Sequence, residues 1–185
     1  MNKFYRMLVD PKATARWYLK APLDQHGLEV DARLFTRGMP IGSTSVLSIP
    51  LRRHGREVDI NFADFDMLVM SRRVVDEITS DFDLEIQRIP AEINGEVNYE
   101  IINPLASISC IDEAESEYLK WTENDGRPEK IGQFRMITQL KVRTDLAIES
   151  HLFRVTEWPI ALLVSEALKE SIESHNASGV TFSAV

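Results

Sequence analysis

The sequence predicts an α+β fold, with a mixed sheet, short helices and two similar strand–helix–strand units in one compact domain. Three observations lead to this prediction: short apolar runs, amphipathic stretches between them, and alternation of apolar with polar residues. A chain of 185 residues can bury a sizeable core without disulfides or metals. We expect residues 1–185 to form a single domain, with 1–90 and 91–185 as its lobes if it divides.

The clearest unit closes the chain. Residues 160–164 form a continuous apolar run that is typical of a buried strand. Ser165 follows as a candidate helix N-cap, and Leu168 and Ile172 share one face of the helix that it would begin. Residues 180–184 then alternate between apolar and polar, which predicts a half-buried strand.

A similar segment occurs earlier in the chain. Residues 67–70 are the apolar run, Ser71 is the candidate N-cap, and Val74 and Ile78 form the apolar stripe of the helix. This order matches the terminal unit and predicts an internal duplication. Because amphipathic helices between strands are common, chance similarity is the alternative explanation.

Turns and short strands are expected before the first unit. Residues 46–51 and 58–62 each predict a strand. The basic residues 52–56 between them predict a hairpin loop that exposes charge. An anion site there is conceivable, but a solvated turn is the simpler interpretation.

The middle of the chain also reads as strands. Asn94 and Gly95 are a strong hairpin signal, and residues 96–101 alternate as a half-buried strand should. Residues 105–111 are expected to continue the sheet after Pro104, and residues 134–142 predict a further strand.

The charge is unevenly distributed along the chain. The net charge is −8; residues 1–60 carry ten Lys/Arg against six Asp/Glu, and the remainder carries eleven against twenty-three. An acidic surface argues against nucleic acid as the main partner, because phosphate contacts need basic side chains. It is compatible with a basic protein partner, and equally with charge that serves solubility alone.

The sequence also indicates where in the cell the protein is expected. It has one cysteine, Cys110, and therefore no internal disulfide. The sequence shows neither the apolar core of a signal peptide nor an apolar run of membrane length, so we expect a soluble cytoplasmic protein with no membrane partner.

No sequence motif indicates a reaction. The four histidines lack zinc-ligand spacing, and neither a Gly-rich phosphate loop nor a nucleophile elbow occurs. Asp59, Asn61, Asp64 and Asp66 superficially resemble calcium ligands but lack the Gly and Glu of an EF-hand. We therefore expect no cofactor, no metal and no enzymatic activity, although folding could still bring Ser, His and Asp together.

The most acidic stretch provides the candidate binding site. Four carboxylates fall within six residues, and two aromatic residues follow closely. Aromatic residues rimmed by charge are typical of protein-binding surfaces, whereas the alternative is a solvated face. The candidate partner-binding residues are Asp112, Glu113, Glu115, Glu117, Tyr118 and Trp121.

Several segments carry a family resemblance through their order and spacing. They are residues 99–103, residues 110–112 with Ser116 and Tyr118, Phe153 with Arg154, residues 163–165, residues 179–182 and Val185. Together they resemble a bacterial immunity-protein family of polymorphic toxin systems, named for a myxococcal immunity protein. The resemblance spans most of the chain and is strongest after residue 60.

The family pattern transfers only structural positions to this chain. These positions are Asn103, Asp112, Ser116, Phe153, Ser165 and Phe182. Pro104 departs from the pattern, which leaves the start of the following strand open.

The resemblance implies a non-enzymatic immunity protein that binds and neutralises a cognate toxin by stoichiometric protein–protein inhibition. The toxin would be encoded by an adjacent gene. Two other functions stay open. A small hydrolase-type enzyme requires a pocket with converging titratable groups. A structural or adaptor subunit of a toxin-secretion system requires a self-complementary apolar surface.

Overall fold

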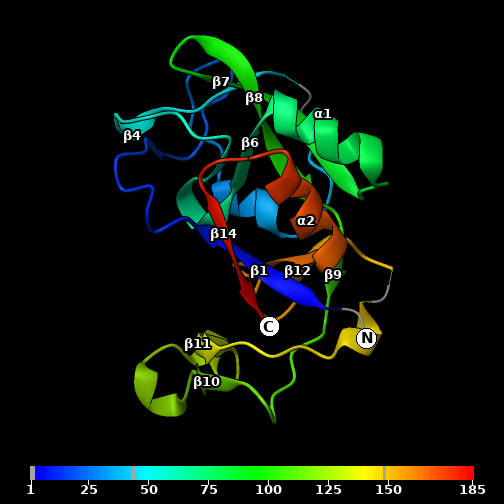
Figure 1. Ribbon diagram of the computed structural model, residues 1–185. Helices are drawn as coiled ribbons and strands as arrows, with labels where there is room; N and C mark the ends of the chain where they lie inside the picture. Colours follow the sequence, from blue (N-terminus) through cyan, green and yellow to red (C-terminus); the bar gives the residue numbers. More distant parts are fainter. Residues whose placement is uncertain (1–2, 43–44, 148) are drawn as a thin grey trace.

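The computed structural model describes residues 3–42, 45–147 and 149–185 (Figure 1). These residues form two five-stranded sheets, two two-stranded ribbons and two α-helices. Each five-stranded sheet combines antiparallel pairs with one parallel pair. The predicted α+β class with mixed sheets and short helices is therefore confirmed.

The elements are short. The helices are α1 (Arg72–Asp81) and α2 (Glu166–Ser174), and the 3₁₀ turns are η1 (Ala32–Thr36), η2 (Asp64–Asp66), η3 (Glu123–Asp125), η4 (Pro128–Lys130) and η5 (Thr144–Leu146). The strands are β1 (Phe4–Val9), β2 (Tyr18–Leu19), β3 (Leu47–Ser48), β4 (Leu51–Arg53), β5 (Ile60–Phe62), β6 (Leu68–Ser71), β7 (Ile86–Ile93), β8 (Glu96–Pro104), β9 (Ser107–Ile108), β10 (Glu117–Lys120), β11 (Phe134–Gln139), β12 (Leu152–Val155), β13 (Leu162–Ser165) and β14 (Val180–Ala184).

The two large sheets have corresponding strand orders. The first sheet runs β3-β7-β8-β6-β5 and the second runs β14-β1-β13-β12-β9. In the first, β8 lies antiparallel between β6 and β7; in the second, β1 lies antiparallel between β13 and β14. Each strand–helix–strand segment therefore crosses over one intervening strand. The N-terminal strand β1 therefore has the same position in the second sheet as β8 has in the first. The duplication itself stays a prediction.

Both helices begin at the predicted serines, but the two hydroxyls act differently. Ser165 Oγ accepts the Leu168 N–H at 3.2 Å, as an N-cap does. Ser71 occupies the N-cap position of α1 without a capping bond, because its hydroxyl donates to the Asp59 carboxylate at 3.0 Å. The capping interaction predicted for Ser71 is wrong, since a charged acceptor outcompetes the helix for this hydroxyl.

The helices and both sheets share one apolar cluster. Val74, Val75 and Ile78 of α1 and Leu168 and Ile172 of α2 are fully buried in it. Each such side chain contributes roughly 1.5–3 kcal/mol by leaving water. Burial of the helix stripes, rather than helix propensity, therefore fixes α1 and α2 in place.

Several strand predictions are wrong in their details. Residues 46–51 divide into β3 and β4, because Pro50 between them cannot donate a ladder hydrogen bond. β4 pairs with β2, while β5 pairs with β6, so the predicted hairpin around residues 52–56 does not form. β5 pairs with the next strand along the chain, whereas the partner of β4 lies far away in sequence and leaves no local signal.

Burial explains a second group of corrections. β8 is exposed only at its first three residues and is buried on both faces from Tyr99 onward, not half-buried throughout. The chain then leaves the first sheet after Pro104, and β9 joins the second sheet instead of continuing the first. β13 begins at Leu162, and β14 is partly buried without a clean alternation. The Asn94–Gly95 hairpin is confirmed, with both residues at positive φ.

Candidate partner-binding site

The acidic stretch leads into a two-stranded ribbon, β10–β11, that projects away from the two large sheets (Figure 1). Tyr118 pairs with Ile137 on its inner face, where Ile137 is only 6% exposed. Tyr118 also stacks edge-to-face on Phe134, with ring centroids 5.0 Å apart. The inner face packs against the cluster that contains Phe153, which anchors the ribbon to the body.

The outer face of the ribbon is apolar and exposed. Leu119 and Met136 lie opposite each other in the ladder and are 55% and 45% exposed. Trp121 lies two residues beyond Leu119, and its N–H bonds the Gln133 carbonyl, so alternation places it on the Leu119 side. We call Leu119, Trp121 and Met136 the ribbon patch. Leu119 and Met136 are exposed and Trp121 is half-buried, and clustered apolar surface of this kind marks interaction sites more often than isolated residues do.

Cations flank the tryptophan of the ribbon patch. Lys130 Nζ lies 5.2 Å and the Arg135 guanidinium 4.8 Å from the centroid of the Trp121 ring. Arg135 is in turn paired with Asp125. These contacts hold the indole in one orientation, and a pre-ordered aromatic loses little entropy on binding a partner.

Two of the four predicted carboxylates are used within the turn itself. Asp112 Oδ1 accepts the N–H groups of Ala114 at 3.1 Å and of Glu115 at 3.3 Å. Glu113 accepts hydrogen bonds from Lys120 at 2.7 Å and from Tyr118 at 2.9 Å, and these lower the pKa of its carboxyl. Both residues shape the turn.

The other two carboxylates point to solvent. Glu115 and Glu117 are exposed, and neither forms an ion pair with a residue that the structure describes. The six predicted residues therefore lie close together in the fold but in different settings. Sequence reasoning missed Leu119 and Met136. A signal for them exists, because β10 and β11 carry apolar residues on both faces although only one face can be buried.

A serine–histidine pair bears on the hydrolase alternative. His151 Nδ1 lies 2.8 Å from Ser165 Oγ, beside a polar cavity of about 290 Å³ whose lining includes Asp83, Glu85 and Glu149. The Ser165 oxygen already caps α2. In the first unit Asp59, which directly precedes β5 as His151 precedes β12, bonds Ser71 in the same way. Both serines at the starts of the helices thus contact a side chain that precedes a neighbouring strand.

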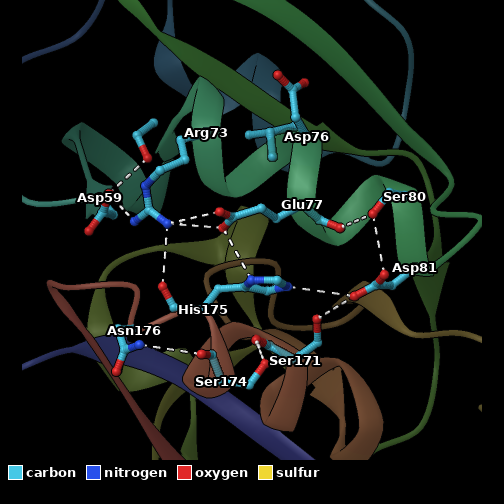
Figure 2. Close-up of polar contacts among 12 residues, drawn as sticks. Asp59, Arg73, Asp76, Glu77, Ser80, Asp81, Ser171, Ser174, His175 and Asn176 are labelled. Atoms are coloured by element: carbon cyan, nitrogen blue, oxygen red, sulfur yellow. Dashed lines mark hydrogen bonds and ion pairs between the residues drawn. The ribbon is translucent and has the colours of Figure 1, made fainter.

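The seam between α1 and α2 holds a dense polar network (Figure 2). His175 lies between two carboxylates, with Nδ1 3.5 Å from Glu77 and Nε2 3.6 Å from Asp81. Arg73 pairs with Asp59 at 2.8 Å and with Glu77 at 3.0 Å, and donates to the His175 carbonyl. Each group is engaged by its neighbours, so the network fastens the helices together.

The four residues that resemble calcium ligands, Asp59, Asn61, Asp64 and Asp66, have different partners in the fold. Three of them are engaged by separate arginines: the pairs are Asp59–Arg73, Asn61–Arg16 and Asp64–Arg52. Across residues 3–42, 45–147 and 149–185, no three His, Cys, Asp or Glu side chains are grouped for a metal ion. Cys110 is buried, and burial raises the pKa of its thiol to about 11, as in an inert core cysteine. None of the helices in the described part has the length and apolar content to cross a membrane.

Comparison with protein families identifies the family of the chain. The model of a family described as an immunity protein family (Imm11) matches residues 67–185. The matched part starts just before β6 and contains α1, the ribbon and the terminal unit, whereas β1 to β5 precede it. No curated protein matches the chain.

Proposed function

Because the chain belongs to the Imm11 immunity protein family, we propose that it protects a bacterial cell by binding and neutralising a cognate toxin. The proposed toxin belongs to a polymorphic toxin system used in bacterial competition and is encoded by an adjacent gene. Inhibition is stoichiometric, without catalysis or cofactor. The proposed location is the cytoplasm, and neither nucleic acid nor membrane is a proposed partner.

The ribbon patch is the observation that supports a binding role most directly. Leu119 and Met136 expose apolar surface on a projecting element, although the opposite face of the same ribbon is packed in the core. Glu115 and Glu117 place unpaired negative charge beside this surface. An apolar centre with a charged rim is the usual anatomy of a protein–protein interface.

We assign the predicted site residues two roles. Glu115 and Glu117 contact the toxin together with the ribbon patch, which includes Trp121. Asp112, Glu113 and Tyr118 shape the turn and hold the ribbon through the hydrogen bonds described above. A basic toxin surface suits this site, because the carboxylates steer encounter and the apolar residues slow dissociation.

Co-expression with the toxin from the adjacent gene tests the proposal. Wild-type protein should rescue growth and co-purify with the toxin, whereas Leu119→Asp combined with Met136→Asp should lose both. The matched control is Leu28→Asp, which changes a similarly exposed leucine outside the ribbon. Growth rescue without any stable complex would contradict stoichiometric inhibition. Self-association of the free protein through the ribbon would instead favour the adaptor alternative.

A further inference from the structure

A second surface feature lies far from the ribbon in sequence. A cavity of about 440 Å³ is lined by residues of β1, β5, the turn before β6 and Ile160. Leu8, Val9, Phe62 and Ile160 give it an apolar lining, and Arg6 and Asp66 add opposite charges. We call this cavity the Arg6 groove.

The arginine of the groove forms no close ion pair with the residues that the structure describes, although the Asp66 carboxylate is near enough to interact with its charge. Its guanidinium lies 4.7 Å from the centroid of the Trp158 ring, and its Nε is buried without a hydrogen-bond partner in the described part of the chain. Burial lowers the pKa of Arg6. A partly desolvated guanidinium without a close ion pair is costly, so an acidic group brought by a partner would be favourable beside it.

A second arginine lies behind the groove wall. Arg154 is completely buried, and it donates to the carbonyl oxygens of Asp66 at 2.7 Å and of Pro159 at 3.0 Å. The Asp66 carboxylate is the countercharge shared by Arg154 and Arg6, and burial raises its pKa despite both. Two guanidinium groups therefore interact with one carboxylate, Arg6 at the groove and Arg154 buried behind its wall, which leaves this region with a surplus positive charge.

The Asp66 backbone is held in a strained form. Phe65 and Asp66 have φ values of 57° and 56°, in the left-handed region that residues other than glycine rarely adopt. The hydrogen bond from Arg154 to the Asp66 carbonyl fixes this turn against its strain. Over-determined strain of this kind concentrates at ligand-binding and recognition sites.

We propose that the Arg6 groove is a second toxin contact, which receives an acidic side chain of the toxin while a neighbouring apolar toxin residue packs on Leu8, Val9 and Ile160. This inference rests on the proposed function. Charge complementarity selects the occupant, because the groove carries a surplus cation and the ribbon site carries surplus carboxylates. Two contacts of opposite sign make recognition selective, since a toxin must match both.

Binding of the purified toxin to charge variants tests the groove. Arg6→Gln should raise the Kd by about tenfold or more, mainly through faster dissociation. Asp66→Asn should lower the Kd by about threefold, because it removes the charge that repels an acidic side chain. Arg53→Gln, which changes an exposed arginine on β4, is the matched control and should leave the Kd unchanged.

The outcomes separate this inference from the function on which it rests. Unchanged affinity for Arg6→Gln, or effects of reversed sign, would overturn the groove while leaving toxin binding intact. Absence of toxin binding by the wild-type protein would overturn both. If Arg6→Gln unfolds, Ile160→Glu and Ile160→Lys replace it, since Ile160 is 38% exposed at the groove. The glutamate should weaken binding and the lysine should not, and equal effects would overturn the proposal.

Discussion

Gly179 provides a sharp test of the packing between the terminal unit and the first sheet. It adopts φ +94°, and a Cβ added there would lie 2.3 Å from the Ile60 carbonyl oxygen and 2.7 Å from Val58 Cβ. Backbone hydrogen bonds from Asp10 to the Gly179 carbonyl and from Ile60 to the Ser178 carbonyl hold this approach. Gly179→Ala therefore requires backbone to move.

The expected loss in the free energy of unfolding has two parts. Placing alanine at positive φ costs about 1–2 kcal/mol. Forcing an extra carbon into a packed contact costs about 1–3 kcal/mol more, for a total of roughly 2–5 kcal/mol. Urea denaturation followed by circular dichroism measures this loss as a lower midpoint at similar slope.

Gly95→Ala is the matched control for the cost of placing alanine at positive φ. Gly95 also has positive φ, at +87°, but nothing lies within 4 Å of a Cβ built there. Gly95→Ala should therefore lower the free energy of unfolding only by the ~1–2 kcal/mol that backbone strain costs. Equal losses at Gly95 and Gly179 would refute the claim that a close approach fixes the terminal unit on β5.

Three further predictions follow from named contacts. Burial alone raises the pKa of Asp59, but hydrogen bonds from Ser178, Arg73 and Ser71 outweigh it and lower the pKa. A carboxyl whose pKa is lower in the folded state stabilises the fold at pH values above its unfolded pKa of about 3.9. This stabilisation is lost as the pH falls through the pKa of the folded state. Asp59→Asn should therefore reduce stability at pH 7 and flatten its decline below pH ~4 in urea titrations, and an unchanged decline would contradict this reasoning. Ser165→Ala should lower stability by about 1 kcal/mol, because it removes the cap of α2; an unchanged urea midpoint would exclude that role. Glu115→Lys with Glu117→Lys should slow toxin association by about tenfold at low salt and less at high salt, and a rate insensitive to both changes would identify a merely solvated face.

Local signals account for the elements that the sequence predicted well. Asn94 and Gly95 need positive φ for their turn, and both residues tolerate it. Ser165 lies between a buried strand and an amphipathic stripe, so the start of α2 follows from neighbouring residues alone. The order of the strands in the sheets, in contrast, depends on pairings between distant segments. Nothing near Phe4–Val9 shows that this strand inserts between β13 and β14, because the pairing spans almost the whole chain.

The candidate site was predictable to a similar extent. The acidic stretch and Trp121 can be read from sequence, but whether a carboxylate is free depends on partners such as Lys120, whose side chain folding brings to Glu113. Apolar residues on both faces of β10 could have indicated Leu119. The Arg6 groove could not be found this way, since Arg6, Asp66 and Ile160 reach it from distant segments.

The proposed function depends on the protein neutralising a toxin by binding it, molecule for molecule. The most direct measurement fixes the amount of toxin in cells, varies the amount of this protein, and records growth together with the recovered complex. We expect growth to return only as the protein approaches the molar amount of the toxin, in step with a complex of constant composition. Full rescue by a small fraction of the toxin amount, with the toxin recovered unbound, would contradict it.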